Sequence, residues 1–246
     1  MVPSVDDVVA ELRAMGNPRN VEGMARFGIA SANTFGISVP ALRALAKRTG
    51  KDHALALALW DTGIHEARSL AAMVDEPAKV TKRQMDRWAA QIDSWDVCDG
   101  CTFELFDRTP YAYDKAVEWS ASKKEFVKRA AFSLMAALTV HDKKAPDAAF
   151  RAMLPIIRRE AGDERNFVKK AVNWALRQIG KRNLALNAAA IATAEQIRAD
   201  GTRAGRWVAA DALRELRSDA VQARLAAKHV GSRRPPAARA GRTARS

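Results

Sequence analysis

Trp95 and Asp99 are the residues whose types and spacing first indicate chemistry. They lie four positions apart within residues 94–100, so on a helix they share one face, one turn apart. A tryptophan beside a carboxylate is an uncommon pair to expose on a chain with a formal net charge of +13. We expect basic residues elsewhere to bring in a polyanion, on part of which this pair acts.

A single carboxylate restricts the reactions that such a pair can catalyse. Most glycoside hydrolysis uses two carboxylates, because the leaving group has to be protonated. A purine base alkylated at a ring nitrogen already carries a positive charge, so it leaves the deoxyribose without protonation. One ionised aspartate can then stabilise the sugar cation and orient a water, while an aromatic ring adds cation–π attraction. Asp99 with Trp95 suffices for this chemistry.

A second group of residues is suited to holding DNA. Trp174 and Arg177 are three positions apart and share a helix face, one turn beyond Lys170. Arg129 lies in a similar stretch earlier in the chain. The planar fork of arginine makes paired hydrogen bonds to phosphate, and such contacts position the backbone without reading its sequence.

Simpler interpretations apply to several of these residues. Trp95 could belong to the core, and Asp99 could be an exposed carboxylate or cap a turn. Cys98 and Cys101 have C-x-x-C spacing, but zinc needs two more ligands and the four histidines are scattered. We therefore expect two buried or half-buried thiols, no metal and no cofactor. The remaining tryptophans are expected to pack in the core or between repeats (Trp60, Trp88, Trp119 and Trp207).

Helix after helix is the main structural pattern of the sequence. Alanine and leucine dominate, and no segment alternates with period two for long enough to predict a strand. Ser4, Ser38 and Thr81 are predicted N-caps. The expected helices cover about 5–15, from 21, from 39 with Pro40 in the opening turn, 52–60, 65–75, 82–92, from 95, shorter helices to 119, 124–139, 147–160, 164–181, 184–199, 203–217 and a closing helix to 228.

An internal repeat supports a helical-repeat fold. Residues 125–131 (EFVKRAA) match residues 166–172 (NFVKKAV) at an offset of 41, and a weaker copy at 206–210 (RWVAA) follows 40 residues later. Chance similarity between alanine-rich helices is the alternative. A period of about 40 residues is typical of HEAT or armadillo repeats. We predict an all-α superhelix of HEAT-like repeats whose basic positions line a concave groove.

The chain is expected to form one domain over residues 1–230, followed by a disordered tail over 231–246 with five arginines and no acids. The tail either adds phosphate attraction or is a solvated terminus. The N-terminus lacks a signal-peptide pattern, and no apolar run approaches the roughly 18 residues that span a bilayer. Two cysteines are too few for a disulfide-built fold. We therefore expect a cytoplasmic protein without a membrane partner.

At these residues the chain resembles the AlkD-type DNA alkylation repair enzymes, which are HEAT-like alkylpurine DNA glycosylases. The resemblance covers most of residues 20 to 215. The matching segments are Met24–Phe27, Phe35–Ile37 with Pro40 and Arg43, Leu59–Trp60, His65–Arg68, Trp95–Asp99, Phe126–Ala131 and Lys170–Arg177. Ser94 stands where the family often has an aromatic residue, and Phe27 where a tyrosine is common, which leaves lesion preference open.

The resemblance implies roles for individual residues. Asp99 would be the catalytic aspartate, Trp95 and Trp174 the active-site tryptophans, and Arg129 and Arg177 the arginines that clamp DNA. Further DNA contacts are predicted at Lys128, Lys170 and Arg206.

The implied function is base excision repair: a monomer that removes 3-methyladenine and 7-methylguanine from duplex DNA, without a deep base-flipping pocket. Two other functions stay open. One is a non-catalytic HEAT-repeat protein that binds DNA by charge. Such a protein would not need the pair formed by Trp95 and Asp99. The other is a protein–protein scaffold, whose groove would carry apolar or mixed-charge anchors in place of lysine and arginine.

Overall fold

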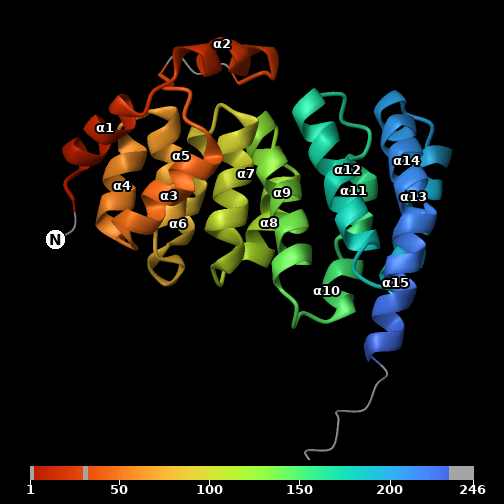
Figure 1. Cartoon of the computed structure of the whole chain (residues 1–246). Coiled ribbons are helices and arrows are strands. Elements are labelled where there is room, and N and C mark those ends of the chain that lie inside the picture. The colour runs from red at the N-terminus through yellow and green to blue at the C-terminus, as the bar shows by residue number, and fades with distance from the viewer. Residues whose placement is uncertain (1–2, 30–32, 233–246) are drawn as a thin grey trace, which may run out of the picture.

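The computed structural model describes residues 3–29 and 33–232, and every regular element within these ranges is helical. The helices stack side by side into a curved array (Figure 1), which confirms the predicted all-α fold of HEAT-like repeats. The α-helices are α1 (Val5–Ala14), α2 (Pro18–Arg26), α3 (Val39–Thr49), α4 (His53–Asp61), α5 (His65–Val74), α6 (Lys82–Gln91), α7 (Trp95–Glu104), α8 (Ala112–Ser120), α9 (Glu125–His141), α10 (Asp147–Arg151), α11 (Leu154–Glu160), α12 (Asn166–Gly180), α13 (Leu184–Ala199), α14 (Arg203–Leu216) and α15 (Asp219–Ser232). Two short 3₁₀ helices cover Pro77–Lys79 and Phe106–Arg108.

Most helix starts follow from local capping chemistry. Ser4 forms a capping box with Asp7, and the Thr81 hydroxyl accepts a hydrogen bond from the backbone N–H of Gln84, so both predicted caps are confirmed. Ser38 also precedes a helix, but its side chain makes no capping hydrogen bond. The opening turn of that helix contains Pro40, which lacks an N–H to be capped.

Three predicted helix boundaries differ from those of the structure. The helix expected over 147–160 is divided into α10 and α11, because Pro155 has no N–H to donate to the preceding turn. α2 begins at Pro18, before the expected start at residue 21. α15 continues to Ser232, two residues into the predicted tail, and the rest of that tail (233–246) lies outside the described residues.

The helices form two rows. In one row, α3, α5, α7, α9, α12 and α14 pack against one another in that order. The helices of the second row pack on those of the first, with α4 on α5, α8 on α9, and α13 against both α12 and α14. The residues of the candidate site come chiefly from α7, α9 and α12, which are consecutive members of the first row.

Stacked aromatic rings join the repeats of the N-terminal half. Trp60 and Trp88 lie parallel with ring centroids 4.0 Å apart, and Phe106 connects Trp88 to Trp119. These three tryptophans are buried, as the sequence predicts. Trp207 differs, because 41% of its surface is exposed.

A buried carboxylate fixes the segment between α2 and α3. Glu66, on α5, accepts hydrogen bonds from the backbone N–H groups of Phe35 (2.9 Å) and Gly36 (2.7 Å) and from the hydroxyl of Thr34 (2.8 Å). Charge-assisted bonds of this kind are among the strong ones in a folded protein. They hold the chain that carries α2 against the body of the repeats.

No helix in the described ranges is both long and apolar enough to cross a lipid bilayer.

Gly36 gives a test of this anchored segment. Its φ is +75°, and an added Cβ would overlap the carbonyl oxygen of Asn17. Gly50 has a φ of +80° but nothing near the position of a Cβ. Gly50→Ala should cost about 1–3 kcal/mol for the backbone conformation alone, because φ +80° with ψ −173° is a combination that only glycine adopts readily. Gly36→Ala should cost about 1–3 kcal/mol more, because the backbone must also shift.

Urea unfolding of the two variants measures this difference. Equal losses of unfolding free energy would show that the contact between the segments at Asn17 and Gly36 is not tight.

Candidate active site

Asp99 and Arg129 form a buried ion pair between α7 and α9. Arginine Nη2 and Nε donate to Oδ2 (2.7 Å) and Oδ1 (3.1 Å) of the carboxylate, a paired geometry. Ser133, one turn further along α9, donates a third hydrogen bond to Oδ1 (3.1 Å). Arginine Nη1 donates to the carbonyl oxygen of Phe167 on α12 (2.8 Å). One guanidinium therefore connects three successive helices of the row.

The environment of Asp99 combines burial with direct charge compensation. Burial raises the pKa of the Asp99 carboxyl above its ordinary value, while the charge and hydrogen bonds of Arg129 and the hydroxyl of Ser133 act in the opposite direction. About a fifth of the Asp99 side chain stays accessible, whereas only 5% of Arg129 is exposed. Among the described residues, Oδ2 accepts a hydrogen bond from Arg129 alone, which leaves acceptor capacity for a substrate or a water.

Trp95 lies one helical turn before Asp99, as their spacing predicts. Its indole Nε1 donates to the carbonyl oxygen of Phe27 (2.9 Å), which ties the end of α2 to the site. The guanidinium of Arg129 lies 5.8 Å from the centroid of the indole ring. Trp95 and Phe27 line a hollow of about 480 Å³ together with Arg26, Gly28, Arg129, Asn166, Phe167 and Lys170.

Trp174 lines a second hollow, of about 450 Å³, on the other side of Arg129. Its ring stacks on Phe103, with centroids 4.9 Å apart and planes 4° from parallel. The same hollow is lined by Asp99, Arg129, Lys170, Asn173, Arg177, Trp207 and Asp211. The two predicted tryptophans therefore lie on separate surfaces that meet at Arg129 and Lys170.

The predicted DNA contacts differ in their availability. Lys170 is exposed, lines both hollows, and has no side-chain partner among the described residues. Arg177 lines the Trp174 hollow but pairs with Glu215 (2.8 Å) and more distantly with Asp211 (3.5 Å). Arg206 is exposed and donates to the carbonyl oxygen of Gly201 (2.5 Å).

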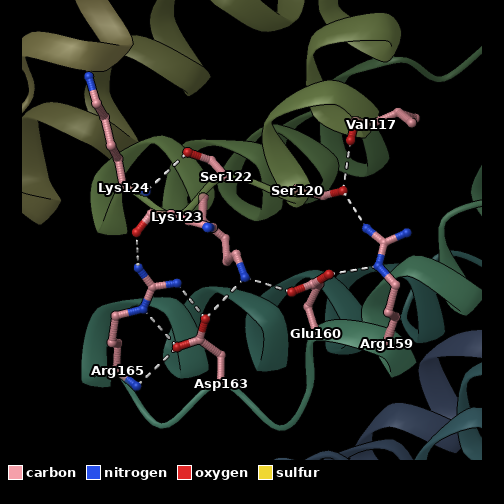
Figure 2. A network of polar contacts seen from close by, with 10 residues as sticks. Val117, Ser120, Ser122, Lys123, Lys124, Arg159, Glu160, Asp163 and Arg165 are labelled. Atoms are coloured by element: carbon pink, nitrogen blue, oxygen red, sulfur yellow. Dashed lines mark hydrogen bonds and ion pairs between the residues drawn. The ribbon is translucent and has the colours of Figure 1, made fainter.

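The structure does not bring Lys128 to the site. Its ammonium lies between Glu160 (2.6 Å) and Asp163 (3.2 Å), two carboxylates that also bind Arg159 and Arg165. Figure 2 shows this network, which extends to Ser120 and the backbone of Lys123. Two of the three N–H groups of the Lys128 ammonium therefore bind carboxylates, and Lys128 lines neither hollow.

The two cysteines are buried beside the site and are not bonded to each other. Burial raises the pKa of each thiol, which disfavours the reactive thiolate. This confirms the interpretation of Cys98 and Cys101 as packed thiols. In the part of the chain that the structure describes, no group of three or more histidine, cysteine, aspartate and glutamate side chains could hold a metal.

Sequence reasoning missed several residues of the site, among them Ser133, Phe103, Arg26 and Asp211. Ser133 and Phe103 follow Arg129 and Asp99 by four positions, so the helical spacing that predicted the first pair could have found them. Arg26 is an exposed cation in the Trp95 hollow, and its place next to Phe27 was the available signal. For Asp211, on α14, no motif or spacing in the sequence indicated a place in the site.

A buried histidine fixes the start of α7. His65 Nε2 contacts Asp96 Oδ2 (2.8 Å), and the Ser94 hydroxyl donates to the other oxygen of that carboxylate. Burial lowers the pKa of His65, but the hydrogen bond and charge of Asp96 outweigh it, so the net shift is upward. The pKa of Asp96 is lowered, because His65 and Ser94 outweigh the burial that raises it. The contact therefore holds the N-terminal end of the helix that carries Trp95 and Asp99.

Together, the fold and the site define a helical-repeat protein with a carboxylate and two tryptophans beside basic residues on its surface. A model of the family described as "DNA alkylation repair enzyme" matches residues 8–221, so the chain belongs to that family. Among curated proteins, none matches the sequence.

A similar solved structure is described as "A new family of proteins related to the HEAT-like repeat DNA glycosylases with affinity for branched DNA structures". It superposes with a TM-score of 0.71 over 78% of this chain and 83% of that chain, at 23% sequence identity. At this identity the likeness establishes the fold alone.

The pair of His65 and Asp96 should make stability depend on pH. A histidine whose folded pKa is raised contributes stability below its unfolded pKa of about 6.5, and this contribution disappears as the pH rises through the folded value. At the acid end, protonation of Asp96 removes the contribution. Because the folded pKa of Asp96 is lowered, this loss begins only below about pH 4. The difference in unfolding free energy between wild type and His65→Gln should therefore be largest near pH 5–6 and smaller at pH 9. A constant difference across this range would contradict the charged pair.

Arg129 should control the ionisation of Asp99. Arg129→Met removes the cation that opposes the effect of burial, so the pKa of Asp99 should rise further. Ser133→Ala should act in the same direction but less, because it removes one neutral hydrogen bond. Carboxyl-carbon NMR titration measures both shifts without relying on activity. A pKa of Asp99 that falls in Arg129→Met would refute the assigned coupling.

Proposed function

We propose that this protein is a DNA glycosylase that hydrolyses the N-glycosidic bond of positively charged alkylated purines in duplex DNA, as a step of base excision repair. The expected substrates include 3-methyladenine and 7-methylguanine. The observation that carries the proposal is the position of Asp99: its carboxylate borders a hollow also lined by Trp174, and Trp95 lies one turn away. Membership of the DNA alkylation repair enzyme family supports the substrate class.

The aromatic surfaces are suited to a cationic nucleotide. Trp174 is backed by Phe103 and Trp95 is held by Phe27, so both indoles are fixed before a substrate arrives. Faces of indole rings attract cations, and the attraction grows when the cation is desolvated. A ligand cation has to compete with Arg129 at the ring of Trp95, whereas the structure gives the Trp174 ring no such cation contact within the described residues.

The chemistry then follows from one carboxylate. The bond between C1′ and the base nitrogen breaks, its electron pair neutralises the cationic base, and the sugar becomes an oxocarbenium ion. The negative charge of Asp99 stabilises this ion. A water adds to C1′, and Oδ2 of Asp99, which has free acceptor capacity, takes the proton. Arg129 favours the ionised form of Asp99 and fixes its orientation.

DNA binding is assigned to the exposed cations around the hollows. Lys170 and Arg26 are exposed and have no side-chain partner in the described ranges, so they can bind phosphates directly. Arg177 can bind a phosphate by exchanging Glu215 for it. These contacts would orient duplex DNA so that the lesion nucleotide lies against Asp99. We expect one monomer to bind each lesion.

A second candidate function is DNA binding without catalysis. The observation in its favour is the ion pair between Asp99 and Arg129, which compensates the charge that catalysis would use. The similar solved structure described as having affinity for branched DNA is consistent with it. Both functions use the same basic surface, and they differ in whether a base is released.

Base release from methylated duplex DNA distinguishes the two functions. We expect wild type to free 3-methyladenine or 7-methylguanine, and Asp99→Asn to lose about 100-fold or more of the rate, because the general base and the charge are both removed. DNA binding should be retained. The matched control is Asp96→Asn, on the same helix: Asp96 contacts His65 and lines neither hollow.

If the control loses as much activity as Asp99→Asn at a temperature where both are folded, the effect belongs to α7 and not to the Asp99 carboxylate. If wild type binds DNA and releases no base, the non-catalytic function is supported.

A further inference from the structure

A second basic hollow lies at the opposite ends of α9 and α12 from the candidate active site. It has a volume of about 520 Å³ and is bordered by the end of α9, the start of α10, the end of α12 and one side of α15. In Figure 1, α10 and α15 reach the lower edge of the array, whereas α2 lies along the upper edge. Five cations line the hollow against one carboxylate, Asp147; the cations are Lys143, Lys181, Arg182, Arg224 and Lys228.

Two of these cations have internal structural roles. Lys181 pairs with Glu215 (2.8 Å). Arg182 donates to the carbonyl oxygens of Thr139 (2.9 Å) and Ala145 (3.1 Å) and lies over the ring of Phe150. The contacts of Arg182 are neutral, so its positive charge is not compensated by them.

The other three cations are exposed and lack a side-chain partner in the part of the chain that the structure describes. They are Lys143, from the segment after α9, and Arg224 and Lys228, one turn apart on α15. The single carboxylate, Asp147, instead accepts two hydrogen bonds from the amide of Asn183 (2.8 and 3.1 Å). Burial and the charges of Arg224, Lys143 and Arg182 lower the pKa of Lys228, as expected where like charges are held close together without a counter-ion.

We propose that this hollow binds phosphate groups of a DNA backbone, as a second contact separate from the hollows around Asp99. Four cations around one concavity, none of them paired with a carboxylate of the described residues, favour an anion with several charges. Duplex DNA carries one negative charge per roughly 1.7 Å of its axis. The proposal rests on the proposed function in one respect, that the chain binds DNA, and it does not require catalysis.

The distance between the two sites fits an extended ligand. Lys170, on α12, lines the hollows around the candidate active site. Lys181, the residue that directly follows the last residue of α12, lines the basic hollow proposed here and lies eleven residues further along the chain. At 1.5 Å of rise per residue they are about 16 Å apart along α12. This corresponds to about five nucleotides of one strand at 3.4 Å each. A small anion in one site could not reach the other, whereas DNA can occupy both.

The salt dependence of binding to undamaged duplex DNA tests the proposal. Arg224→Ala/Lys228→Ala removes two of the unpaired cations from a helix in which alanine is well tolerated. The matched control is Arg83→Ala/Lys47→Ala, which also removes one arginine and one lysine from exposed helical positions without a side-chain partner among the described residues. The slope of log K against log salt should fall by about 1.8 in the test variant, for two lost phosphate contacts. The control should change by less than half of that.

The other outcomes are decisive as well. If the slope of log K against log salt changes no more in the test variant than in the control, the proposal is wrong. So does a wild type that binds labelled inorganic pyrophosphate in this hollow while the variant keeps the wild-type slope on DNA, because the hollow would then be a small-anion site. Base release, measured separately at saturating DNA, should be unchanged in the test variant. A wild type that binds duplex and releases no base contradicts the proposed catalysis alone, and one that binds no DNA contradicts both proposals.

Discussion

The site depends on the buried ion pair between Asp99 and Arg129. The pair crosses from α7 to α9, and the same guanidinium continues to the carbonyl of Phe167 on α12. Removing one partner of such a pair costs about 3–5 kcal/mol, because the other charge stays buried without compensation. The contact that orients the carboxylate is therefore also a contact that holds three repeats in register, so the chemistry and the packing of this region cannot change independently.

Position in the repeat of about 41 residues, together with side-chain direction on the helix, explains which basic residues reach the hollows around Asp99. Phe126 and Phe167 are equivalent in the repeat, and their rings pack 5.5 Å apart between α9 and α12. Neighbouring residues on a helix are about 100° apart, so the two basic residues that follow each phenylalanine point in different directions. Arg129 and its equivalent Lys170 face the hollows, whereas Lys128 lies within a network of carboxylates.

Much of the fold could be read from the sequence, because helical periodicity, caps and the repeat offset are local signals. The shared face of Trp95 and Asp99 was predictable for the same reason. Partners from distant helices were not: nothing near Arg177 indicates that Glu215 pairs with it, and nothing distinguishes Lys128 from Arg129 except its position on the helix. Trp207 shows the same limit, since its sequence pattern resembles that of the half-buried phenylalanines of the repeat, whereas 41% of its own surface is exposed.

Different basic residues attract DNA from a distance and bind it at contact. Arg129 and Arg177 are already paired with carboxylates, so they add little to the attraction of DNA at a distance. That attraction comes from unpaired cations such as Lys170, whose charge acts over about a Debye length, roughly 8–10 Å at physiological salt. At contact the order reverses for Arg177, because this paired arginine has a fixed position and can offer a planar fork to phosphate by exchanging Glu215 for it. Arg129 keeps Asp99 as its partner. A surface of this kind attracts DNA with its unpaired lysines and orients it with a fixed arginine.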